Sequence, residues 1–193
     1  RELLQHGTEV LYAPDLSLAA YNPGAIDLSA DVVAWGDSVT KQIAAVLWQK
    51  SKDHGQLFMP TRSSVKYDPD CCELTIRQKM ENVRYALKSK AATAIDSRMF
   101  VVKTGEEFYQ KVSSLKLYIT GRFHGACLAY LAGTPFVCVR SNTRKIEQLL
   151  IDAGLNPDRL VECGGLANVF ERDWSYSDVE TRNRELFLLD AEE

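Results

Sequence analysis

The stretch from Lys116 to Lys145 limits the possible folds of this chain more than any other part of the sequence. It begins with a β-branched and aromatic run at 117–120, which is typical of a short strand. A nearly all-apolar segment at 126–132 follows and ends at Gly133, a pattern typical of a short helix buried on all sides. A second apolar run at 136–139 predicts another strand. Strand, helix and strand in this order predict a βαβ unit, which normally belongs to a parallel sheet.

The turn between the first strand and the helix of this unit carries Gly121, Arg122, His124 and Gly125. A helix N-terminus attracts anions, because its free N–H groups carry a partial positive charge. Arginine grips a carboxylate or phosphate with two hydrogen bonds, and histidine binds an anion or transfers a proton near neutral pH. Two interpretations follow. Either this turn is an anion site, or Arg122 pairs with an acidic neighbour and His124 is a helix N-cap.

The rest of the chain alternates between strand and helix patterns from about residue 31 onward. We expect further strands at 31–36, 56–59, 98–102 and 160–163. We expect further helices at 40–50, 68–89, 104–115, about 146–150 and 176–190. The helix at 68–89 is expected to bury a stripe formed by Ile76, Met80, Val83 and Leu87. This alternation predicts an α/β fold with a Rossmann-like, doubly wound parallel sheet.

In such folds, ligands bind outside the carboxyl ends of the strands. The side chains expected at that edge are mostly cations and hydroxyls: Ser38, Arg62, Ser63, Lys103, Arg122, His124, Asn142, Thr143 and Lys145. Paired carboxylates do not dominate any strand exit, so a metal site or glycosidase chemistry is disfavoured. The recurrence of cations at one edge predicts a pocket for an anionic small molecule.

Charge and cysteine content exclude several function classes. The net charge of −3 gives no global positive field for nucleic acid. The five cysteines form neither a zinc pattern nor an even disulfide framework, which favours a reducing compartment. No apolar run is long enough to cross a bilayer. We therefore expect a cytoplasmic protein that does not bind nucleic acid, and leave peripheral membrane contact and oligomeric state open.

The first 24 residues look different from the rest. They contain a helix end, a short strand pattern at 10–12 and a turn at 22–24, without partners of their own in the sequence. The first residue is Arg rather than Met. We expect residues 1–24 to be the end of a preceding domain plus a linker, and residues 25–193 to form the Rossmann-like domain.

Three groups of residues resemble the polysaccharide pyruvyl transferase family. They are the run Tyr118–Gly125, the Gly133-Thr134-Pro135 turn, and Asn142-Thr143 with Lys145 two residues on. The likeness is strongest over about 100–155, and Pro60-x-Arg62 is similar to a basic loop of the family. The resemblance implies that the domain is the C-terminal half of a two-domain GT-B fold.

The resemblance also implies an activity. Members of this family transfer the enolpyruvyl unit of phosphoenolpyruvate to sugar hydroxyls as a pyruvate ketal, which serves the synthesis of cell-surface polysaccharides. The expected partners are this donor and a sugar or polysaccharide-precursor acceptor, with no metal or other cofactor. His124 would be the general acid or base, and the substrate would be bound by Arg122, Arg62, Lys145, Asn142, Gly121 and Ser38.

Two alternatives remain open at this point. The same fold could belong to a nucleotide-sugar glycosyltransferase, in which an acidic residue such as Glu147 or Glu162 would bind ribose hydroxyls. The domain could also be a non-catalytic module that binds a ligand or a partner. Stabilisation by phosphoenolpyruvate rather than by nucleotide sugars would separate the first alternative from the pyruvyl transferase.

Overall fold

A computed structural model describes residues 31–61, 75–102, 104–141 and 144–190 of the 193-residue chain. Its centre is a parallel sheet of five strands: β1 (Val33–Ser38), β2 (Leu57–Phe58), β3 (Leu117–Gly121), β4 (Phe136–Val139) and β5 (Leu160–Val161). The strand order is β2-β1-β3-β4-β5, and every neighbouring pair is parallel. The predicted Rossmann-like, doubly wound α/β fold is therefore confirmed.

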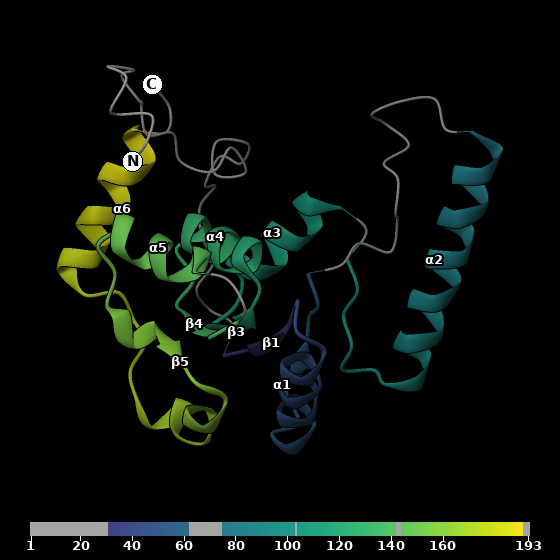
Figure 1. Ribbon diagram of the computed structural model, residues 1–193, viewed down its shortest axis with the longest axis horizontal. Helices are drawn as coiled ribbons and strands as arrows, with labels where there is room; N and C mark the ends of the chain where they lie inside the picture. The colour runs from purple at the N-terminus through teal and green to yellow at the C-terminus, as the bar shows by residue number, and fades with distance from the viewer. Residues whose placement is uncertain (1–30, 62–74, 103, 142–143, 191–193) are drawn as a thin grey trace.

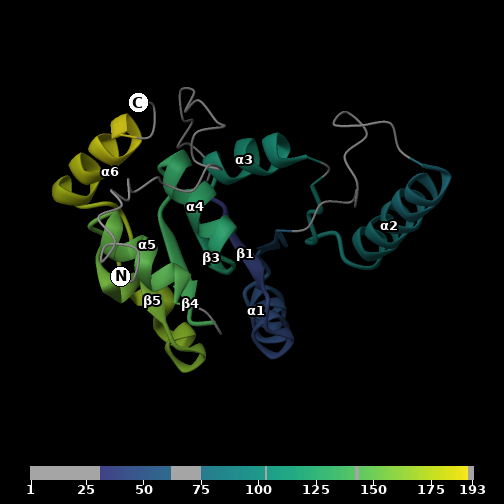
Figure 2. The same cartoon turned by 45° about the horizontal axis from the view of Figure 1, so that its top comes forward.

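Helices cover both faces of this sheet (Figure 1). They are α1 (Lys41–Asp53), α3 (Gly105–Ser113), α4 (Phe123–Ala132), α5 (Lys145–Asp152) and α6 (Asp178–Asp190), with short 3₁₀ segments η3 (Pro157–Arg159) and η4 (Cys163–Glu171). A further helix, α2 (Ile76–Ile95), stands away from the sheet (Figures 1 and 2). No helix in the described ranges is long and apolar enough to cross a membrane.

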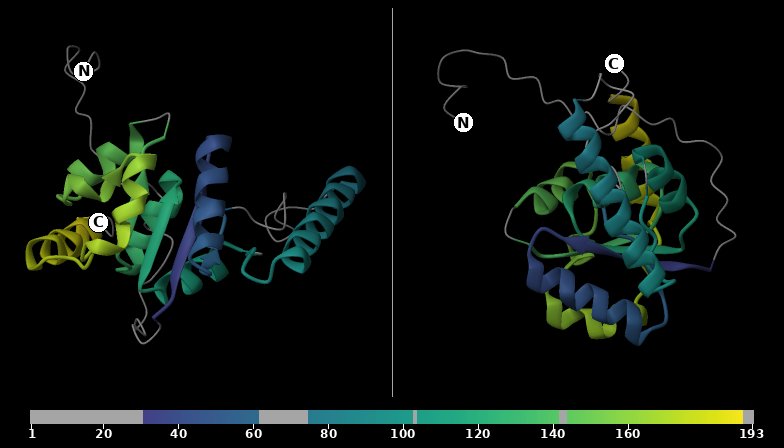
Figure 3. Two further views of the ribbon diagram at one scale, coloured as in Figure 1. Left: turned by 90° about the horizontal axis from the view of Figure 1, so that it is seen from below. Right: turned by 90° about the vertical axis from the view of Figure 1, so that its right-hand side faces the viewer.

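Two apolar layers hold the sheet between its helices. One layer lies beneath α3, α4 and α5 and includes Tyr118 and Tyr130, and the other lies beneath α1 and η4 and includes Trp35 and Leu47. Figure 3 shows α1 on the side of the strands opposite α4 and α5. Each strand of the central pair, β1 and β3, is thus buried on both faces, as expected for a parallel sheet.

The helix α4 is buried as the sequence predicts. Every residue from Gly125 to Ala132 is buried, because α4 packs against β3, β4, α3 and α5. The helix ends at Gly133, whose φ of 72° lies in the left-handed region that glycine adopts without strain. The strand-helix-strand unit at 117–139 is therefore confirmed.

Three expectations from the sequence are wrong. The stripe of Ile76, Met80, Val83 and Leu87 is exposed rather than buried, and α2 ends at Ile95 rather than near residue 89. Helical spacing marks one face as apolar, but it does not say which element covers that face. The expected strand at 98–102 is reduced to an isolated bridge between Met99 and Phe58, beside the short edge strand β2.

Other expectations lie outside the described residues. These include the start of the helix at Asp68 and the elements before residue 31. The assignment of residues 1–24 to a preceding domain therefore stays a prediction. The 3₁₀ segment η4, which packs Leu166 and Val169 against the sheet, was not predicted.

Candidate functional site

The strand order places a topological switch point between β1 and β3. The chain leaves β1 for the edge strand β2 and then returns to the other side of β1 to form β3. The helices that follow these two neighbours, α1 and α4, cover opposite faces of the sheet (Figure 3). In sheets of this kind, ligands bind outside the carboxyl ends of the strands at the switch point. The carboxyl ends here carry Asp37 and Ser38 on β1 and Gly121 on β3, which is followed directly by Arg122, the N-cap residue of α4.

Asp37 and Arg122 form an ion pair across this switch point. Nε and Nη2 of Arg122 donate to Oδ2 of Asp37, at 3.1 and 2.8 Å. The other oxygen, Oδ1, accepts a hydrogen bond from the backbone N–H of Thr61, at 2.9 Å. The side chain of Asp37 is 7% exposed and that of Arg122 is 22% exposed. The carboxylate therefore fixes the orientation of the guanidinium through Nε and Nη2, and part of the Arg122 side chain stays exposed to solvent.

Small residues let β1 and β3 approach closely at this edge. The hydroxyl of Thr120 accepts from the backbone N–H of Arg122 at 3.1 Å and donates to the carbonyl of Asp37 at 3.4 Å. The hydroxyl of Ser38 donates to the carbonyl of Gly121, also at 3.4 Å. A Cβ on Gly121 would lie only 2.6 Å from Cβ of Ser38, so a side chain there would push the two strands apart. The backbone around Arg122 is thus tightly defined.

His124 and Lys145 both lie beside the ring of Phe123. His124 is exposed in the first turn of α4, and its ring packs edge-on against Phe123, with centroids 5.5 Å apart. Nζ of Lys145, the first residue of α5, lies 5.7 Å from the centre of the Phe123 ring. Both lysine and histidine are therefore beside the N-terminus of α4. Within the described residues, the N-cap residue Arg122 makes no side-chain capping bond, so the first N–H groups of α4 stay free for a ligand.

The structure thus gathers part of the predicted set at one place. Arg122, Gly121, His124 and Lys145 surround the start of α4, while the hydroxyl of Ser38 is buried and turned inward to Gly121. Arg62 and Asn142 lie outside the described residues, as do Ser63, Lys103 and Thr143.

The sequence pattern did not predict that Asp37 pairs with Arg122. The available signal was its position at the exit of a strand that becomes the neighbour of β3 at a switch point. Of the two interpretations of Arg122, the structure shows the ion pair with an acidic neighbour, which is Asp37. Because that pairing leaves one side of the guanidinium partly open, it does not exclude an anion site.

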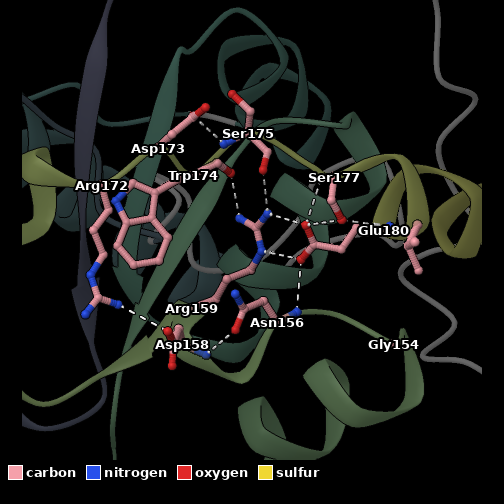
Figure 4. Close-up of a pocket in the computed structure, with 11 residues that line it drawn as sticks. Gly154, Asn156, Asp158, Arg159, Arg172, Asp173, Trp174, Ser175, Ser177 and Glu180 are labelled. Carbon is pink, nitrogen blue, oxygen red and sulfur yellow. Dashed lines mark hydrogen bonds and ion pairs between the residues drawn. The ribbon is translucent and has the colours of Figure 1, made fainter.

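A second charged cluster lies near the amino-terminal end of β4, and its charged groups bond to other groups of the protein (Figure 4). Arg159 donates to both carboxylate oxygens of Glu180 and to the carbonyls of Phe136, Trp174 and Ser175. Burial raises the pKa of Glu180, but hydrogen bonds from Arg159, Asn156 and Ser177 outweigh this effect and lower the pKa to about 2. The cluster lines a cavity of about 410 Å³ and ties α6 to the sheet.

The acidic candidates for a ribose site are also engaged. Glu147 and Glu162 both form ion pairs with Arg140, which follows β4. Among the residues that the structure describes, no group of three or more histidine, cysteine, aspartate or glutamate side chains is arranged to hold a metal ion.

Comparison with known proteins gives one family. A family model described as polysaccharide pyruvyl transferase matches residues 5–143. The matched range contains Asp37, Arg62, Arg122, His124 and Asn142, and it ends two residues before Lys145. No curated protein and no solved structure matches the chain significantly.

Proposed function

The chain belongs to the polysaccharide pyruvyl transferase family, and on that premise we propose that it transfers the enolpyruvyl unit of phosphoenolpyruvate to sugar hydroxyls, forming a pyruvate ketal. The observation that carries this proposal is the Asp37–Arg122 pair at the β1/β3 switch point, beside the free N-terminus of α4. The product would belong to a cell-surface polysaccharide or its precursor.

Arg122 suits the donor because phosphoenolpyruvate carries a carboxylate and a phosphate. Asp37 occupies the Nε and Nη2 side of the guanidinium, and among the described residues Nη1 has no hydrogen-bond partner. The open end can therefore donate to an anionic oxygen of the donor. The N–H groups at the start of α4 and the ammonium of Lys145 add positive potential at the same place. In this proposal Arg62 and Asn142 supply further donors.

His124 is the proposed proton carrier. Ketal formation adds a proton to the methylene carbon of the donor and breaks the bond between C2 and the phosphate oxygen. Two sugar hydroxyls each form a bond to C2 and lose their protons. One of these protons accounts for the proton added to the methylene carbon, and the other is taken up by the departing inorganic phosphate. In this proposal the imidazole of His124, exposed in the first turn of α4 and two residues from Arg122, delivers or receives such a proton.

The proposal is tested by the release of inorganic phosphate from phosphoenolpyruvate in the presence of a panel of acceptor sugars, with the ketal product identified by mass. His124→Ala should lower turnover at least about a hundredfold, as expected for the loss of a general acid or base. His54→Ala is the matched control, because it removes an imidazole at the end of α1, whose ring packs against Trp35. Equal turnover in the two variants would refute the role of His124. Transfer from a nucleotide sugar instead of phosphoenolpyruvate would refute the proposed donor.

A further inference from the structure

The helix α2 presents an apolar face that no described part of the chain covers. Ile76 is 79% exposed, Met80 68%, Val83 59% and Leu87 62%. The helix stands apart from the sheet and from the other helices (Figures 1 and 2, and the left view of Figure 3). An exposed set of large apolar side chains on one face marks a site of interaction, since water-exposed apolar surface is unfavourable.

The distribution of charge around this face is specific. At about 100° per residue, the four apolar side chains fall within an arc of about 60°. Arg77, Arg84 and Lys88 border this arc on one side, and Lys79 and Lys90 border it on the other; all five are exposed. The opposite face carries Gln78, Asn82 and Tyr85. Basic residues thus lie along both borders of the apolar stripe.

The helix differs in charge from the rest of the protein. Residues 76–95 contain five basic side chains and one acidic side chain, Glu81, although the whole chain has a net charge of −3. Oε1 of Glu81 lies 3.8 Å from Nε of Arg77 in an i,i+4 pair, in which Arg77 is exposed and Glu81 is half-buried. The surface that covers the stripe must therefore tolerate apolar side chains at its centre and supply negative charge along both sides.

A second copy of this helix does not meet these requirements. In a parallel pair Lys79 would face Arg84, and in an antiparallel pair Arg77 would face Arg84, so like charges would meet in either arrangement. The apolar spacing also continues for only two heptads, because the next seam positions are Lys90 and Ala94. A stable helix–helix seam needs large apolar side chains over three or more heptads.

We propose that this face of α2 docks in the interfacial layer of a bilayer that contains anionic phospholipids. The narrow apolar stripe would enter the boundary between headgroups and acyl chains. The basic side chains on both borders would extend along the surface to the lipid phosphates. Such a helix lies in the plane of the membrane and does not span it. Docking of this kind would hold the protein near a membrane-linked acceptor, but it does not depend on the activity of the site.

Co-sedimentation of the purified protein with lipid vesicles tests the proposal. We expect binding to vesicles of phosphatidylcholine with about one third phosphatidylglycerol to be at least about tenfold tighter than binding to pure phosphatidylcholine, because several basic residues contribute about fivefold each near an anionic surface. Binding should weaken as salt is added. Absence of binding to both kinds of vesicle, or equal binding to both, would overturn the proposal.

A pair of variants separates apolar docking from charge. Met80→Glu and Gln78→Glu add the same charge two residues apart, on opposite faces of α2. Gln78→Glu also keeps the acceptor that receives the backbone N–H of Thr75 at 2.9 Å, so the helix start is preserved. We expect Met80→Glu to bind anionic vesicles at least about tenfold more weakly than Gln78→Glu, because only Met80→Glu loses apolar burial. Equal binding by the two variants, with helix content verified by circular dichroism, would contradict docking through this face. Binding to an acidic protein with none to vesicles would assign the face to a protein partner instead.

Discussion

Replacing Asp37 by asparagine should destabilise the protein by about 2 kcal/mol and weaken the candidate site at the same time. The change keeps the shape of the side chain but removes its charge and one of its two acceptor oxygens. In the native protein Oδ2 receives two N–H groups of Arg122 and Oδ1 receives the N–H of Thr61. The single oxygen of an amide can accept either from Arg122 or from Thr61. The NH₂ group of the asparagine then faces the other donor, and the two repel.

The expected magnitude follows from these contacts. A hydrogen bond to a charged group contributes about 1.5–3 kcal/mol, and an unsatisfied buried donor costs a further 1–3 kcal/mol. The side chain of Arg122 is 22% exposed, so water can replace part of the lost interaction. A net cost of about 2 kcal/mol corresponds to a fall of about 4–8 °C in the melting temperature of a domain of this size. Because Arg122 also loses its anchor, the apparent affinity for phosphoenolpyruvate should fall about tenfold or more.

The chain offers a matched control for this substitution. Asp31 pairs with Lys116 at the opposite ends of the same two strands, but its side chain is 87% exposed. Asp31→Asn should therefore change stability by no more than about 0.5 kcal/mol. Urea denaturation of both variants measures the difference, and a phosphoenolpyruvate titration of each measures the effect on the site. If Asp37→Asn were as stable and bound the donor as tightly as Asp31→Asn, the anchoring role of Asp37 would be refuted.

Two further predictions concern stability. Gly121→Ala should lower the free energy of unfolding by about 1–3 kcal/mol, because the new Cβ would lie 2.6 Å from Cβ of Ser38. Gly164→Ala is the control and should be tolerated, since its Cβ meets nothing within 4 Å. A similar melting temperature for the two variants would contradict the close approach of β1 and β3. For Glu180, the folded-state pKa of about 2 lies below the unfolded value, so the unfolded chain binds the proton first and stability is lost as the pH falls from about 5 to 2. Between pH 5 and 3, the free energy of unfolding should fall by about 2 kcal/mol less in Glu180→Gln than in the wild type, as measured by chemical denaturation. An equal fall in the two proteins would show that Glu180 is not the group responsible.

The most predictable part of the fold was the unit around α4. Its helix consists almost entirely of apolar residues between two glycines, so it can be stable only when buried on all sides. The end of β3 and the start of α4 follow from the same run, and with them the positions of Gly121, Arg122 and His124. Local sequence is enough here because the strand, the turn and the helix are contiguous.

The contacts between distant elements were not predictable in the same way. The order of strands makes β1 the neighbour of β3, and only this order brings Asp37 to Arg122. Ile76 and Met80 are exposed although their spacing predicts a buried face. The spacing of apolar residues cannot distinguish a helix face that packs on the sheet from one that does not. Residue 99 pairs as a single bridge because the edge strand β2 offers only two residues.

The most direct measurement of the central claim is a calorimetric titration of phosphoenolpyruvate into the wild-type protein and Arg122→Lys, with Arg140→Lys as the control. Lysine at 122 can still pair with Asp37, but it lacks the planar guanidinium whose remaining N–H groups can hydrogen-bond to a second anion. We predict that phosphoenolpyruvate binds the wild type and the control alike, and that Arg122→Lys binds it at least about tenfold more weakly. Failure of the wild type to bind phosphoenolpyruvate, or equal binding by all three proteins, would contradict an anion site at the β1/β3 switch point.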